Sequence, residues 1–342
     1  MWTDSGYAYA KASWLIGKSF LGKRMSSLTG IHTLNELDKN IFQESYMELP
    51  GRELLADLEK RIVERSVRHI ISIVNSFSQP PKLLVRLLKG IEYSYFIECL
   101  SSIAGGKTEL PIISDIGRFG TIRFDAFPDV GAMLRKTDFE HLLSQELKSV
   151  KKGMELVDIE TKLDYRYYQS LIESLSQLEF EDREVAARLI ADEISLRNCL
   201  WIMRLRTYYN KTETEAAKYI MNLNMYGKIQ QKRATLCAEA RASLNFSLDV
   251  RDDWRGWRWE RFLNEEGSSS HWSIDPRHFQ NAASQYLHHL YLRHFHSSPM
   301  SVSAIFCFIK LKQYEEDLLT SVAEGLSLGI SSSNVFKMLE VS

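Results

Sequence analysis

Apolar residues along this chain recur mostly at the spacing of an α-helix. The clearest case is 155–178, where the apolar positions never lie more than four residues apart: Leu156, Ile159, Leu163, Tyr167, Leu171, Leu175 and Leu178. A stripe of this period lies on one face of a helix and packs against a core or a partner helix. The chain also predicts helices at 52–77, 82–103, 183–207, 226–245 and 278–295. A last long helix within 301–329 is closed by Gly329 and followed by a short one.

Proline, glycine and small polar residues mark where these helices begin and end. Gln79-Pro80-Pro81 ends the first, because proline disrupts a helix interior and its predecessor avoids the helical conformation. Gly105-Gly106 ends the second. Thr212 or Thr214 is expected to cap a helix that begins near Glu215.

The stretch 110–131 follows a different pattern. Prolines and glycines interrupt short β-branched runs there, at Pro111, Gly117, Gly120, Pro128 and Gly131. We expect a connector with a small hairpin at Thr121–Phe124.

Long helices, short breaks and weak strand signals predict an all-α chain. Helical segments with a polar cluster recur at 92–103, 193–207 and 313–324, at intervals of roughly one hundred residues. This spacing suggests three copies of one helical unit. The predicted divisions are 1–110, 111–224 and 225–342.

Composition narrows the function classes. The 342 residues are 44% hydrophobic and 25% charged with a net charge of −1, whereas a dedicated nucleic-acid binder usually carries a basic surplus. The cysteines at 99, 199, 237 and 307 form no Cys-x-x-Cys pair, so zinc binding is not expected and a reduced, cytosolic compartment fits best. No apolar run approaches the roughly 18 residues that span a bilayer. We therefore expect contact with a membrane only through a partner.

The stretch 251–261 is rich in tryptophan and arginine and allows three interpretations. The pair Asp252-Asp253 could hold magnesium for a diphosphate, as in helical prenyl-transfer enzymes, but Gly256 stands where a further acid is needed. Alternating Trp and Arg could stack nucleic-acid bases. The interpretation that we favour is that the tryptophans pack in a core or a protein interface while the arginines pair with acids.

Other candidate motifs lack the spacing that their chemistry needs. The histidines at 288, 289, 294 and 296 include no pair four residues apart. Gly117-Arg118-Phe119-Gly120 and Gly105-Gly106-Lys107-Thr108 do not match a phosphate-binding loop. We expect no catalytic residue, metal or cofactor.

Four segments, in matching order and spacing, resemble the C subunit of the V-type/A-type rotary ATPases, which is related to the eukaryotic d subunit. The first is Tyr7-Ala-Tyr9-Ala-Lys11, followed by Gly17-Lys18. The second is Leu87-Leu-Lys-Gly-Ile-Glu92-Tyr-Ser-Tyr95-Phe96. The third joins Val157-Asp158-Ile159-Glu160 and Leu163-Asp164-Tyr165-Arg166-Tyr167-Tyr168 to Glu193-Ile-Ser-Leu-Arg-Asn198. The fourth runs from Phe308-Ile309-Lys310 to Gly329.

This resemblance implies a funnel of three similar helical domains with pseudo-threefold symmetry and no catalytic activity. The protein would lie on the cytoplasmic side of the membrane, with its base on the proteolipid ring. Its hollow would receive the tip of the central D–F axle. Membrane contact would be made only through the ring, and no nucleic acid would bind. The chain departs from the family pattern at Tyr95, Ser195, Gln313 and Glu316.

A socket for a helical axle needs polar, adaptable walls. Helix ends expected at Glu92, Asn198 and Glu315 could supply them. The candidate partner-interface residues are Glu92, Glu193, Asn198, Arg204, Lys310, Glu315, Trp254 and Trp257. An unrelated α-helical scaffold or adaptor is the alternative, because it explains the composition equally well.

Overall fold

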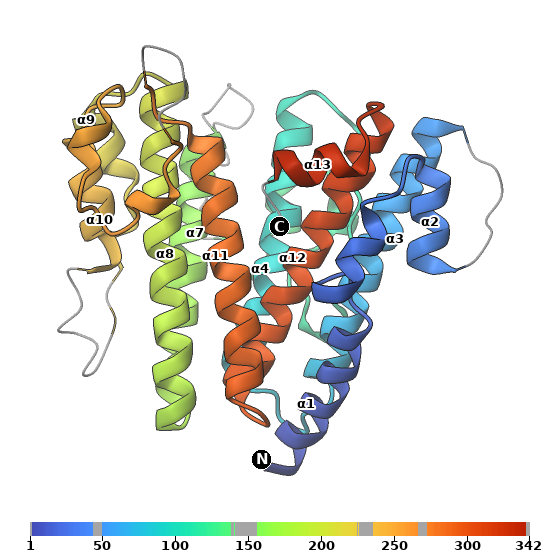
Figure 1. The fold of residues 1–342 in the computed structure, drawn as a ribbon. Helices are drawn as coiled ribbons and strands as arrows, with labels where there is room; N and C mark the ends of the chain where they lie inside the picture. The colour runs from blue at the N-terminus through green and yellow to red at the C-terminus, as the bar shows by residue number, and fades with distance from the viewer. Residues whose placement is uncertain are drawn as a thin grey trace. The chain divides into compact units, whose positions relative to one another are not determined.

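A computed structural model describes residues 2–43, 50–137, 140, 156–223, 225, 235–265 and 272–339. Within these ranges the regular structure is helical and contains no β-strand, which confirms the all-α class (Figure 1). The chain forms two compact units, one made of Met1–Tyr167 with Phe295–Ser342 and the other of Tyr168–His294. We call them unit 1 and unit 2. The division into three similar domains stays a prediction.

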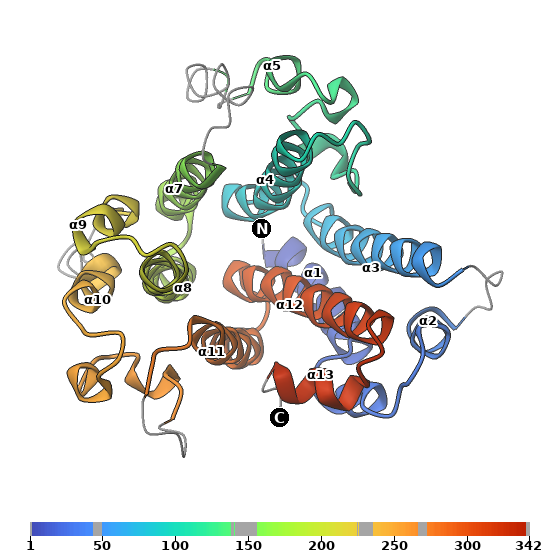
Figure 2. The same ribbon diagram turned by 90° about the horizontal axis from the view of Figure 1, so that it is seen from above.

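Unit 1 is organised around the long helix near its C-terminal end. Its helices are α1 (Trp2–Gly17), α2 (Leu34–Phe42), α3 (Gly51–Val74), α4 (Lys82–Ala104), α5 (Val130–Met133), α12 (Val302–Ser327) and α13 (Ser332–Met338). Helix α12 contacts α1, α3, α4 and α13, and Figure 2 shows it among them. The first turns of α12, Val302–Ile309, are buried on all sides, as expected for a helix that is hydrophobic all round.

Unit 2 is organised around α8. Its helices are α8 (Phe180–Tyr208), α9 (Glu213–Ala216), α10 (Thr235–Leu244) and most of α11 (Pro276–Ser297). The last turns of α7 (Leu156–Ser174) also belong to unit 2, whereas its residues up to Tyr167 belong to unit 1. Helix α8 packs closely on α10 and buries thirteen of its side chains, including Ala186, Ile190, Ile194 and Ile202. It is therefore the core helix of this unit.

Most predicted helices are present with ends shifted by a few residues. Of the two predicted caps, Thr212 and Thr214, it is Thr212 that forms the N-cap of α9, in a capping box with Glu215. Residues 226–234 of the predicted helix 226–245 lie outside the described part, and α10 covers most of the remainder.

The hairpin predicted at Thr121–Phe124 is wrong. The structure has a 3₁₀ turn at Phe124–Ala126 instead. The backbone N–H groups of Thr121 and Ile122 bind the Glu92 carboxylate, so they are not available for a strand ladder.

Among the described residues, three hydrophobic clusters surround α4, α8 and α12. One in unit 1 surrounds α4 and includes Phe96, Cys99, Met133 and Leu163. The second in unit 1 surrounds the C-terminal half of α12 and includes Phe20, Leu37, Leu319 and Phe336. The third fills unit 2 around α8. Each of these long helices thus has an apolar cluster of its own.

Helices α12 and α13 approach closely at Gly325. A Cβ atom built at this position would overlap the Cγ2 atom of Val335. Alanine is otherwise better than glycine inside a helix, by about 1 kcal/mol. Close packing rather than backbone conformation therefore requires glycine here.

We expect Gly325→Ala to lower the free energy of unfolding by about 1–3 kcal/mol, because the new methyl group overpacks the α12–α13 contact. Chemical denaturation measures this. The Gly325→Ala/Val335→Ala double variant should recover part of the loss. Gly6→Ala is the matched control, since nothing lies within 4 Å of that position in α1 and the substitution should be neutral or stabilising. Equal effects of Gly325→Ala and Gly6→Ala would contradict the packing argument.

Candidate functional site

Glu92 lies in the middle of α4 and is 1% exposed. Its Oε1 atom accepts the backbone N–H groups of Thr121 and Ile122 at 2.5 Å, and its Oε2 atom accepts the Thr121 hydroxyl at 3.0 Å. A buried carboxylate needs such donors, because desolvation without them is costly. Glu92 therefore anchors a connector about thirty residues downstream to α4.

Asn198 on α8 likewise anchors a distant segment to its helix and is also 1% exposed. Its Oδ1 atom accepts the Met221 N–H at 2.9 Å, and its Nδ2 atom donates to the carbonyls of Met221 and Leu236 at 3.2 and 3.3 Å. One side chain thus holds the segment before α10 and the first turn of α10 itself.

Glu315 on α12 is the third buried polar residue of this kind, at 2% exposure. It accepts the Phe20 N–H at 2.7 Å, and its carboxylate pairs with Lys312 on the same helix and with Arg65 of α3 at 3.5 Å. Phe20 is 295 positions away along the chain. Glu315 therefore fastens the N-terminal segment to the C-terminal long helix.

We call Glu92, Asn198 and Glu315 the three anchors. The expectation that they lie at helix ends is wrong, because each is in a middle turn of a long helix. Each side chain can be buried there because its polar atoms form hydrogen bonds with backbone groups of a distant segment in place of water. Burial leaves none of the three at the surface, and their part in a partner interface stays a prediction.

Charged groups gather around the third anchor. Burial would raise the pKa of Glu315, but Lys312, Arg65 and the Phe20 N–H outweigh it, and the net shift is downward. Burial lowers the pKa of Lys312, against the opposing attraction of Glu315. Burial, reinforced by Lys312 and Arg65, lowers the pKa of nearby His69 to about 4. The α3–α12 contact therefore contains an ionic cluster inside an apolar interface.

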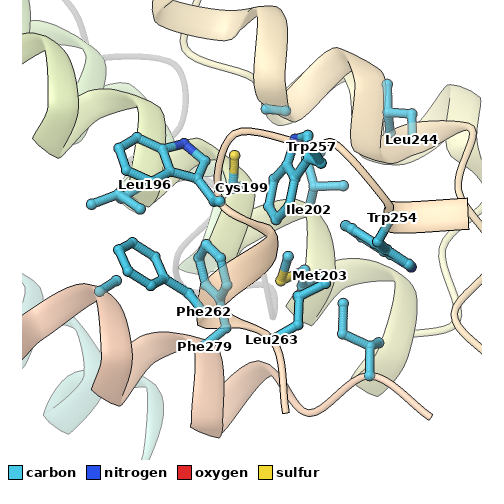
Figure 3. Packing of buried hydrophobic residues seen from close by; sticks show 14 of the residues in the cluster. Leu196, Cys199, Ile202, Met203, Leu244, Trp254, Trp257, Phe262, Leu263 and Phe279 are labelled. Carbon is cyan, nitrogen blue, oxygen red and sulfur yellow. The ribbon is translucent and has the colours of Figure 1, made fainter. Parts of the chain in front are cut away.

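The tryptophans of the Trp/Arg stretch belong to the core of unit 2, where Figure 3 labels Trp254 and Trp257. Trp254, Trp257 and Trp259 are 0%, 7% and 2% exposed, and the first two rings lie 5.1 Å apart. Every indole N–H of the three donates a hydrogen bond, to Ser247 O, Glu239 O and Ser195 Oγ respectively. The interpretation of these tryptophans as core residues is confirmed.

Three of the four arginines of this stretch pair with acids, as expected, and Arg251 does so with Glu260 at 3.4 Å. Arg255 binds Asp252 at 2.9 Å, and Arg258 binds Asp192 of α8 at 2.6 Å. The other aspartate of the pair, Asp253, accepts the Ser247 N–H at 3.0 Å. Both carboxylates of the candidate magnesium motif are thus engaged within the chain. Across the described residues, no cluster of three or more His, Cys, Asp or Glu side chains could hold a metal ion.

Two adjacent acids brace α8 against its neighbours. Glu193 accepts the hydroxyls of Tyr168 and Tyr291 at 2.8 and 2.9 Å. Asp192 accepts the hydroxyl of Tyr286 at 2.8 Å in addition to Arg258. Burial, together with the hydrogen bond to Asp192, raises the pKa of Tyr286 to about 12, so its hydroxyl remains a donor.

The two remaining predicted site residues are partly exposed. Arg204 donates to Gln280 Oε1 at 2.6 Å, and Lys310 lies on α12 five residues before Glu315. The structure brings Trp254 and Trp257 together. The eight predicted residues divide between the two units, and their joint role in a partner interface stays a prediction.

One open groove lies at the end of α8 in unit 2. It is lined by Arg206, Asn210, Lys211, Thr212, Glu213, Thr214 and Leu248. Arg206 donates to the carbonyls of Ser243 and Phe246, and Thr212 is occupied by the capping box. Arg206 and Thr212 are therefore used in contacts that hold the fold together.

The cations that balance Glu315 were not predicted from the sequence. Lys312 precedes it by three residues, so the two share a helix face, and the apolar surroundings at 302–311 were a signal that this face is buried. Arg65 and His69 come from α3, and local spacing does not reveal their position.

Comparisons with known proteins cover nearly the whole chain. The family model described as ATP synthase (C/AC39) subunit matches residues 20–337. An uncharacterized protein of Treponema pallidum is 27% identical over 94% of this chain and 92% of its own length. The C subunits of the A-type ATP synthases of Methanosarcina acetivorans and Methanosarcina mazei are 25% and 24% identical over 75% of this chain. These matches span 65% of the two archaeal proteins.

We expect Glu315→Gln to lower the free energy of unfolding by about 3–5 kcal/mol, because it leaves buried Lys312 and Arg65 without their counter-charge. The Lys312→Met/Glu315→Met double variant should lose less, since it leaves one cation, Arg65, without its counter-charge instead of two. Urea unfolding compares the two. A larger loss in the double variant would show that the ion pair itself stabilises the fold.

The carboxyl of Glu316, next to Glu315 in the sequence, should make the stability of the protein depend on pH. Burial raises the pKa of Glu316 from 4.5 to about 7. The folded protein thus holds this proton more tightly than the unfolded chain, and stability falls as the pH rises from 4.5 to about 7, by up to about 3 kcal/mol. Glu316→Gln should flatten that decline in urea unfolding measured across the pH range.

His69 should change the pH dependence of stability in the opposite direction, and His69→Gln tests this. The pKa of His69 falls from 6.5 to about 4, so the wild-type protein loses stability as the pH drops through this window. The His69 variant should retain its stability there. The same pH profile in both variants and the wild type would show that neither group titrates differently on folding.

Proposed function

Because this chain belongs to the ATP synthase (C/AC39) subunit family, we propose that it is a non-catalytic central-rotor subunit of a V/A-type rotary ATPase. It couples the D–F axle of the soluble motor to the membrane proteolipid ring and so contributes to ion transport. Membership of the family overturns the alternative of an unrelated helical scaffold. The match over residues 20–337 is the observation that carries this proposal.

The packing supports a mechanical role. A part that transmits torque must resist bending, and stiffness comes from close packing and from polar links that hold one geometry. The three anchors tie long helices to distant segments, and Glu193 links α8 to α7 and α11. The described polar clusters are used in this internal bracing, which suits a coupler better than an enzyme.

Partner contacts belong to the exposed surface in this proposal. The proteolipid ring and the D and F subunits are the partners, and the chain is a peripheral protein on the cytoplasmic side of the membrane. Within the described residues, no helix is both long and apolar enough to cross a bilayer. Arg204 and Lys310 contribute to the interface directly, while the buried anchors shape the segments that partners touch.

The first test is affinity purification of the tagged full chain from gently solubilised native membranes. We expect the proteolipid and the D and F subunits to be recovered, as identified by mass spectrometry. Arg204→Glu should reduce their recovery, because it reverses a charge at the proposed interface. Lys60→Glu is the control, since its 57% exposed side chain lies on α3, away from the proposed interface residues in sequence. Recovery of the chain alone, or with unrelated proteins, would contradict the proposal.

Depletion of the chain tests the coupling itself. Hydrolysis of ATP by the soluble motor should persist while ion pumping stops, because the motor would turn without driving the ring. Equal loss of both activities would place the chain in the motor instead.

A further inference from the structure

The N-terminal part of the chain has an unusual balance of charge. The range 5–35 contains Lys11, Lys18, Lys23 and Arg24 but no aspartate or glutamate. The whole chain has 43 basic and 44 acidic residues, so this acid-free stretch is a local basic segment in a nearly neutral protein. A basic segment of this kind is suited to an anionic partner.

Two large aromatic side chains are exposed on the same helix. Tyr7 is 63% and Trp14 is 58% exposed, and their spacing of seven residues places both on one face of α1. Ala8 and Ala12 of the same helix are completely buried against unit 1. Helix α1 therefore packs on the rest of unit 1 with Ala8 and Ala12 and presents Tyr7 and Trp14 outward.

Two cations that follow Trp14 in the chain, Lys18 and Arg24, lie over aromatic rings. The Lys18 ammonium lies 3.9 Å from the centre of the Trp14 ring, and the Arg24 guanidinium lies 4.4 Å from that of Phe20. Arg24 also donates to the Lys18 carbonyl at 2.5 Å. Neither cation forms an ion pair with any carboxylate in the described ranges. Lys11, by contrast, is occupied by the Ser72 carbonyl at 2.8 Å.

We propose that Tyr7, Trp14, Lys18 and Arg24 form a binding surface for anionic phospholipid headgroups. Tryptophan and tyrosine favour the interface between membrane and water, where the ring is half in an apolar layer and its polar atom is in the headgroups. Lysine and arginine add attraction to an anionic leaflet. An acidic protein segment would match the charges, but the exposed aromatic pair favours lipid.

This surface goes beyond the proposed role in the rotary complex. It also replaces the expectation that the chain meets the membrane only through the ring. The isolated protein can be tested without ring or axle, so failure of lipid binding and failure of the rotor proposal are separate outcomes.

The experiment is co-sedimentation of the purified full chain with vesicles. We expect binding to phosphatidylcholine vesicles that contain phosphatidylglycerol and little binding to phosphatidylcholine alone. Added salt should release the protein, because it screens the attraction. Equal binding to both kinds of vesicle would overturn the proposal. So would capture by soluble poly-glutamate without vesicle binding, which would assign the surface to an acidic protein.

Variants locate the surface. Trp14→Ala and the Lys18→Glu/Arg24→Glu double variant should each weaken vesicle binding about tenfold or more. Tyr208→Ala and Lys82→Glu are matched controls, because they change an exposed aromatic residue and an exposed lysine elsewhere. Thermal unfolding verifies that all four proteins remain folded. Wild-type binding by the Trp14 variant and the Lys18/Arg24 double variant, or equal losses in the controls, would overturn the assignment.

Discussion

A polar group that leaves water must find partners inside the protein, and this requirement organises the long helices of the chain. Glu92, Asn198 and Glu315 are almost completely buried, and each binds backbone groups from a segment far along the sequence. The surrounding clusters supply most of the burial energy, but apolar contacts alone do not select one register. The anchors add direction, because a hydrogen bond is satisfied in few geometries.

Unit 1 is built from segments at both ends of the chain, and the third anchor links them. Glu315 binds Phe20, and the Ser332 hydroxyl donates to the carbonyls of Thr29 and Ile31 at 3.0 and 2.7 Å. Leu37 and Ile41 of the N-terminal segment pack in the same cluster as Leu319 of α12. Polar and apolar contacts thus close the unit together, and the N-terminal segment completes the core around the C-terminal long helix.

In unit 2, aromatic and charged side chains of one stretch likewise serve packing and internal pairing. Trp254, Trp257 and Trp259 fill a core, while Arg258 reaches Asp192 on α8. A stretch that resembles a nucleic-acid or diphosphate site in sequence therefore serves packing. Such internal bracing fits the mechanical role that we propose, in which stiffness matters more than any reactive group.

Helical periodicity and breaker residues by themselves determined the all-α class, the approximate ends of most helices and the Thr212 cap, because these depend on interactions within a few residues. The order of four short segments also determined the family. Tertiary structure decided what the anchors bind, which cations balance Glu315, and that Thr121 and Ile122 give their N–H groups to Glu92 instead of a hairpin. The backbone groups that the anchors bind lie from 23 to 295 residues away in sequence. Local spacing carries no information about such contacts, since they form only when folding brings distant segments together.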